Sequence, residues 1–77
     1  MALVASFTAA TKESQKRHDA VDCHYSEFVG SDGKVYFQLD THGRADRKIP
    51  GKISQTLQFD EHSGRELKRL LELAFPG

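Results

Sequence analysis

The sequence has a single cysteine, Cys23, and no tryptophan. One cysteine excludes an intramolecular disulfide and any zinc motif built on cysteine pairs. We therefore expect a reducing, cytoplasmic setting, and a small domain that relies on local structure, on oligomerisation, or on both. The longest uncharged stretch, residues 1–11, is too short to span a bilayer, so no membrane partner is expected.

The sequence also lacks a net charge, because eleven Lys and Arg balance eleven Asp and Glu. The whole molecule therefore has no field that would steer it toward polyanions. With 77 residues, of which 38% are hydrophobic, the chain fits one soluble domain with a thin core. We expect an N-terminal arm of uncertain order over residues 1–20 and a single β-β-β-α domain over residues 21–77.

Three stretches, residues 21–29, 35–40 and 53–59, alternate between apolar and polar positions, which predicts three strands. A glycine-rich turn lies between the first two. A two-residue turn at Asp32 and Gly33 would place Phe28 opposite Phe37, whereas a three-residue loop with a left-handed Gly33 places Val29 opposite Val35. The second register is favoured because it gathers the apolar residues on one face. That face comprises Val21, Cys23, Tyr25, Val29, Val35, Phe37 and Leu39.

The C-terminal stretch predicts an amphipathic helix. Leu67, Leu70, Leu71 and Ala74 form one apolar stripe, and the helix is capped by Asp60 or by Ser63. The expected fold is therefore α+β: a three-stranded antiparallel β-meander with the C-terminal α-helix packed on one face. Residues 3–8 suit a short edge strand, and residues 12–19 suit either a short helix or a solvated arm. The sequence leaves open whether the helix packs on its own sheet or on that of a partner.

The segment between the second and third strands gathers four basic residues: Arg44, Arg47, Lys48 and Lys52. Arginine makes bidentate contacts to phosphate, lysine supplies a point charge, and nearby glycines let a backbone approach an anion. The leading hypothesis is thus a small non-catalytic binding protein that meets nucleic acid through this basic loop, with Gln55 and Tyr36 as base contacts.

A second hypothesis keeps the same fold and treats the basic loop as a solvated surface. Leu73 and Phe75 flank the helical stripe, and exposed there they would form an apolar contact surface. The protein would then be a protein-interaction or regulatory module, such as an inhibitor or accessory subunit, acting as a homodimer.

Catalytic, metal and cofactor sites are poorly supported. Cys23 is expected on the core face, where a thiol behaves as a small hydrophobe. His24 and His42 could meet across the strands, but no spacing matches a zinc motif. No glycine-rich phosphate loop precedes a helix, and Phe28 with Tyr36 form an aromatic pair on a face that carries repelling carboxylates. We expect no enzyme, no cofactor and no metal.

Overall fold

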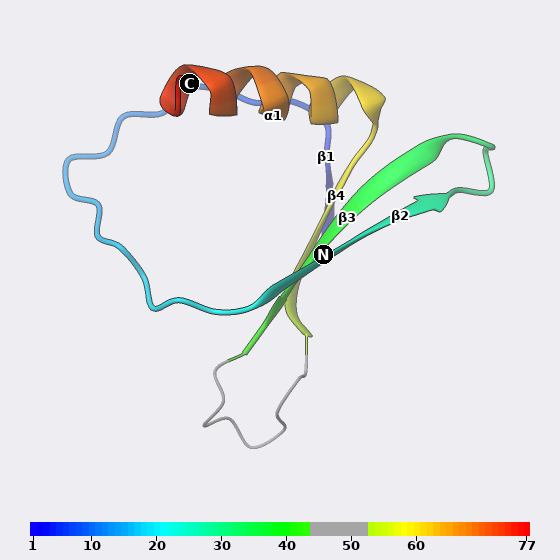
Figure 1. Ribbon diagram of the computed structural model, residues 1–77, viewed down its shortest axis with the longest axis horizontal. Helices are drawn as coiled ribbons and strands as arrows, with labels where there is room; N and C mark the ends of the chain where they lie inside the picture. Colours follow the sequence, from blue (N-terminus) through cyan, green and yellow to red (C-terminus); the bar gives the residue numbers. More distant parts are fainter. Residues whose placement is uncertain (44–52) are drawn as a thin grey trace.

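The computed structural model describes residues 1–43 and 53–77 of the chain. It has an α+β fold, as predicted, with four strands and one helix (Figure 1). The elements in chain order are β1 (Ala2–Val4), β2 (Cys23–Val29), β3 (Val35–His42), β4 (Ile53–Phe59) and α1 (Glu61–Ala74).

The sheet is four-stranded and mixed, with the order β1-β4-β3-β2. The strands β2, β3 and β4 form the predicted antiparallel meander. The fourth strand, β1, is an edge strand as expected and pairs in parallel with β4, but it overlaps the expected residues 3–8 only at its end, Leu3 and Val4. Phe7 anchors the chain after β1, because its ring stacks on Phe59 with the centroids 6.4 Å apart.

The β2–β3 hairpin has the three-residue loop that the apolar pattern favoured. Val29 pairs with Val35 and Tyr25 with Leu39, and Gly33 has a left-handed φ of 79°. The loop is closed by the Gly30 N–H, which donates to the Lys34 carbonyl at 2.8 Å. Glycine adopts this conformation at no steric cost, so Gly33 fixes which residues fall on each face.

The pairing separates the sheet into an apolar and a polar face. On the apolar face lie Cys23, Tyr25, Glu27, Val29, Val35, Phe37, Leu39, Leu57 and Phe59. On the polar face lie His24, Ser26, Phe28, Tyr36, Gln38, Asp40, Thr56 and Gln58. Glu27 is the one charged side chain among the paired residues of the apolar face.

The helix begins at the first of its two predicted caps. The Asp60 carboxylate accepts from the Ser63 N–H at 2.8 Å, and the Ser63 hydroxyl accepts from the Asp60 N–H at 3.1 Å. This reciprocal capping box satisfies two of the N–H groups that a helix start leaves unpaired. Ser63 is fully buried by it.

Residues 5–22, which join β1 to β2, contain no helix. The arm alternative is therefore the observed one for residues 12–19, and Figure 1 shows this arm sweeping widely around from β1 to β2. Among the described residues, no helix is long and apolar enough to cross a membrane.

The core is small because α1 contacts β3 and β4 near its start and then runs away from the sheet (Figure 1). Phe59, 4% exposed, is the one buried hydrophobic residue in the described part of the chain. Leu71 in the second half of the helix is 47% exposed. The helical stripe is thus on the apolar side of the sheet, as predicted, but the sheet leaves much of it uncovered.

Candidate functional site

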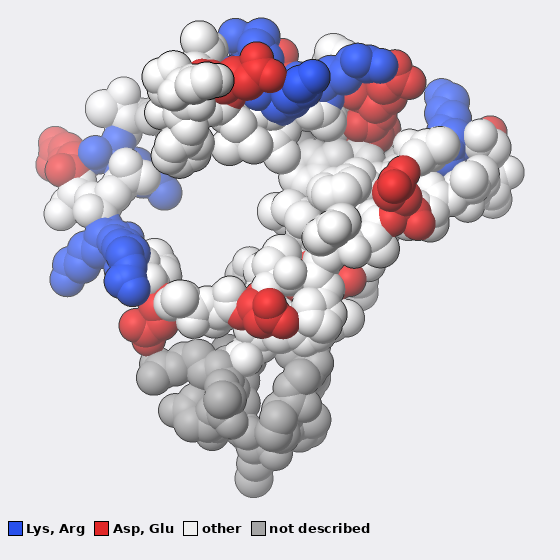
Figure 2. Space-filling view, viewed as in Figure 1, with Lys and Arg blue, Asp and Glu red and all other residues white. Residues whose placement is uncertain are grey.

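In the described part of the chain, an open hollow lies between α1 and the apolar face of the sheet. It consists of two cavities of about 750 and 510 Å³ that share Phe37, Phe59, Gly64 and Lys68. Figure 2 shows an opening bounded by the helix, the sheet and the arm. We call the smaller cavity the apolar groove; its lining residues are Phe37, Phe59, Gly64, Leu67, Lys68, Leu71, Glu72 and Phe75.

The groove exists because two apolar surfaces face it without meeting. From the sheet, β3 and β4 supply Phe37 and Phe59, whose register places both on the apolar face. From the helix, Leu67 and Leu71 recur at the spacing of one turn. A monomer of this size normally closes such surfaces together, since burying them is the main favourable term in folding.

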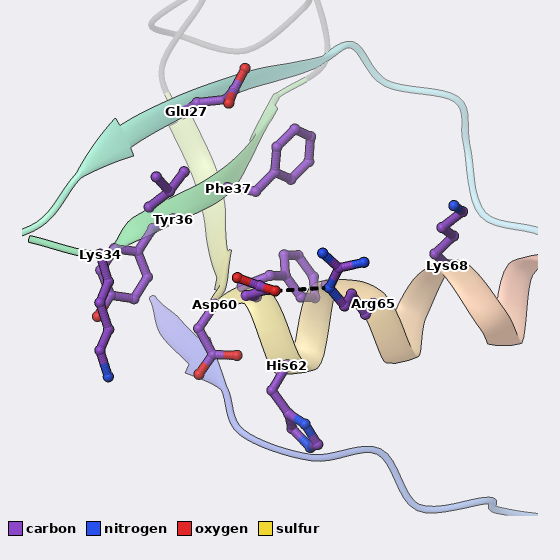
Figure 3. A pocket seen from close by; sticks show the side chains of 12 residues that line it. Glu27, Lys34, Tyr36, Phe37, Asp60, His62, Arg65 and Lys68 are labelled. Carbon is purple, nitrogen blue, oxygen red and sulfur yellow. Dashed lines mark hydrogen bonds and ion pairs between the residues drawn. The ribbon is translucent and has the colours of Figure 1, made fainter.

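The larger cavity continues the hollow toward the start of the helix, and its rim is charged (Figure 3). Glu27 borders it from β2, while Arg65 and Lys68 border it from α1. The Arg65 guanidinium pairs with Glu61 at 3.0 Å. At the helix start, hydrogen bonds from the Ser63 backbone N–H and hydroxyl hold the pKa of Asp60 below its ordinary value.

The polar face, in contrast, is held together by its own side chains. The Thr56 hydroxyl donates to the Asp40 carboxylate at 2.6 Å, and the Gln38 amide donates to the same carboxylate at 3.0 Å. The Gln58 side-chain amide donates to the Gln38 side-chain carbonyl oxygen at 2.9 Å, which adds a second bond between β3 and β4. These bonds, Thr56 first and Gln38 second, lower the pKa of Asp40.

The aromatic pair of the polar face forms as predicted, with the Phe28 and Tyr36 ring centroids 5.5 Å apart. The Tyr36 hydroxyl donates to the Asp32 carboxylate of the hairpin loop, which lowers the pKa of Asp32 and raises that of Tyr36. Tyr36 is therefore already engaged within the hairpin.

The two histidines also meet as the strand pairing suggested, with the His24 and His42 ring centroids 4.0 Å apart. His24 contacts Asp22 at 2.8 Å. Within residues 1–43 and 53–77, no group of three or more His, Cys, Asp or Glu is arranged to hold a metal ion. Cys23 lies on the apolar face by register, but it is exposed rather than in a core, so the expected burial of its thiol is wrong.

The residues predicted to contact nucleic acid are not brought together by the described structure. Arg44, Arg47, Lys48 and Lys52 lie outside the described residues. Gln55 pairs with Thr41 and falls on the apolar side, whereas Tyr36 lies on the polar face near the other end of β3. Five residues of strand, about 17 Å, separate Tyr36 from Thr41.

The two predicted interface residues also separate. Phe75, 77% exposed, lines the apolar groove, but Leu73, 68% exposed, is not among its lining residues. Residues two positions apart in an α-helix are rotated by about 200° around the helix axis, so Leu73 lies on the side of α1 opposite Leu71. The sequence missed Phe37 and Leu71 as site residues because their apolar periodicity is typical of a closed core.

Comparison with known protein families, with curated proteins and with solved structures gives no match.

Proposed function

We propose that the protein is a small non-catalytic interaction module whose working surface is the apolar groove, which binds a protein surface. The observation that carries the proposal is the exposure of Phe37, Leu71 and Phe75 along one continuous hollow. Contiguous apolar surface of this kind is rare on soluble monomers and is typical of interaction sites.

The chemistry of the groove supports binding rather than catalysis. Its lining is aromatic and aliphatic, with Lys68 and Glu72 as the charged members. A reaction site needs convergent polar groups in a water-excluding cavity. Here the hollow is open, and aromatic side chains such as those of Phe37 and Phe75 are enriched at protein interfaces.

A position-specific photo-crosslinking experiment tests the proposal. A photo-reactive phenylalanine analogue is placed at Phe75 in one full-length variant and at Leu73 in a matched control. On irradiation in the cells that produce the protein, we expect protein adducts from position 75 and few from position 73. Equal labelling from both positions, or none from position 75, contradicts the proposal.

A further inference from the structure

We infer that the protein surface bound in the apolar groove is a second copy of this chain, in a two-fold dimer in which the helices α1 cover each other's grooves. This inference rests on the proposed function and names its partner. Its starting observation is the mismatch between the size of the chain and the surface it exposes.

The exposed surface is far larger than a closed monomer would have. The chain exposes 6986 Å², whereas a folded monomer of 8.6 kDa exposes about 4,700 Å². Its radius of gyration is 14.8 Å, against about 11.5 Å for a compact domain of 77 residues. The exposed arm of residues 5–22 contributes part of this excess of roughly 2,300 Å², and obligate dimers bury roughly 1,000–2,500 Å² on each subunit.

The chain also carries both halves of a matching pair. The groove needs an apolar surface to fill it, and its own helical wall is such a surface, with Leu71 in α1 and Phe75 at the C-cap, both exposed. A two-fold interface uses the same patch on both subunits, so one groove and one exposed helix per chain are sufficient. No foreign partner has to be invoked to cover either surface.

The order of residues along α1 fits an antiparallel arrangement of the two helices. A two-fold axis that crosses α1 midway between Gly64 and Phe75 places the bulky Phe75 of one copy against Gly64 of the other. Gly64 presents no side chain there, and an added Cβ would stand in ordinary van der Waals contact with Phe59 Cβ at 3.9 Å. The same axis brings Lys68 of each copy toward Glu72 of the other, so the charges of the groove are complementary. The chain has no net charge, so two copies do not repel each other.

The first test is the mass of the purified full-length chain in solution, measured by light scattering over about 1–100 µM. We expect a mass of about 17 kDa, twice that of the chain. Leu71→Lys places a charge in the groove and is expected to halve the mass at the same concentration. Leu73→Lys makes the same change on the opposite side of the helix and is expected to leave the mass at the dimer value.

The two lysine variants share helix propensity and net charge, so they differ only in where the charge is placed. A wild-type chain that stays at 8.6 kDa throughout the range contradicts the inference. If the two variants are both dimeric, or both monomeric, the groove is not the dimer interface.

The second test does not depend on a variant folding. If the dimer is the folded species, the midpoint of thermal unfolding of the wild-type chain rises with protein concentration. A midpoint that is constant over a hundredfold range contradicts the inference.

A spin label on Cys23 adds a distance measurement, because a dipolar signal arises from one label per chain only when two copies associate.

The failures of the two proposals are distinguishable. If the chain is monomeric but position 75 still forms adducts with other proteins, the proposed interaction module stands and the inference of a second copy is wrong. Position-75 adducts of twice the chain mass support both. A monomeric chain without position-dependent adducts removes both.

Discussion

On the polar face of the sheet, Asp40 accepts hydrogen bonds from Thr56 and Gln38, and Gln58 continues the network. On the apolar face, Phe37 borders an open hollow whose far wall is Leu71. The polar face therefore satisfies its own groups within one chain, whereas the apolar face does not.

The difference follows from the range of the two interactions. A hydroxyl, an amide and a carboxylate on adjacent strands reach one another directly, because paired residues of neighbouring strands are about 5 Å apart. Apolar side chains of one sheet face cannot cover themselves, and they need a second layer about 10 Å away. In this chain the second layer is a single helix that meets the sheet near its start. The apolar face is consequently where a partner is required.

The largest expected effect is on the free energy of unfolding. It compares Phe59, the buried aromatic residue of the described chain, with Phe28 on the polar face. Phe59→Ala removes the ring that stacks on Phe7 and lines both cavities, and we expect a loss of about 3–5 kcal/mol in the free energy of unfolding. Phe28→Ala, whose ring is half-exposed, is expected to cost much less. Urea unfolding at one fixed protein concentration measures both. Equal losses would mean that the two faces do not differ as described.

The next effect tests the turn that assigns residues to the faces. Gly33 has a left-handed φ of 79° and open space where a Cβ would stand, so Gly33→Ala is expected to cost about 1 kcal/mol from backbone strain. Gly33→Asn is the matched control, because asparagine tolerates this conformation. Urea unfolding of the two variants should give a smaller loss for Asn. If both variants were as stable as the wild-type chain, the loop geometry would be wrong.

These two predictions concern the parts of the fold that the sequence defines best. Strand alternation, together with the need for glycine at position 33, determined the β2–β3 register because a one-residue slip would invert every side chain. The cap was left between Asp60 and Ser63, and the capping box uses both. A short edge strand was predicted at residues 3–8, but its parallel pairing with β4 was not, because three apolar residues carry no pairing direction. The open groove could not be predicted either. The apolar stripe at Leu67 and Leu71 indicates that this face of the helix is covered, but it does not indicate whether the same chain or another chain covers it.

A smaller effect is expected within the polar face. Hydrogen bonds from Thr56 and Gln38 lower the pKa of Asp40 from its ordinary 3.8. The stability that this carboxylate contributes is therefore present above about pH 3.8 and is lost as the pH falls through its lower folded-state pKa. Thr56→Val removes the first of these donors, so the pKa of Asp40 should rise toward 3.8 and the acid dependence of stability should weaken.

Carbon-detected NMR titration of the side-chain carboxyls measures this change directly. Asp60 is the internal control, because its pKa is lowered by Ser63 at the helix start and should not respond to Thr56→Val. An unchanged pKa of Asp40 in the variant would show that Thr56 is not its principal donor. A parallel shift of Asp60 would indicate a general change of fold instead.

The smallest expected effect on the fold concerns the basic residues 44–52, whose nucleic-acid role stays a prediction from the sequence. Gln55 and Tyr36 lie on opposite faces of the sheet, and the variants below address the phosphate contacts predicted for Arg44 and Arg47. Arg44→Ala with Arg47→Ala should leave unfolding by urea unchanged. Retention on DNA or RNA at low salt, if it occurs in the wild-type chain, should weaken similarly for all sequences, and its salt slope should fall by about 2. No retention of the wild-type chain at low salt would remove this hypothesis while leaving the groove and its partner untouched.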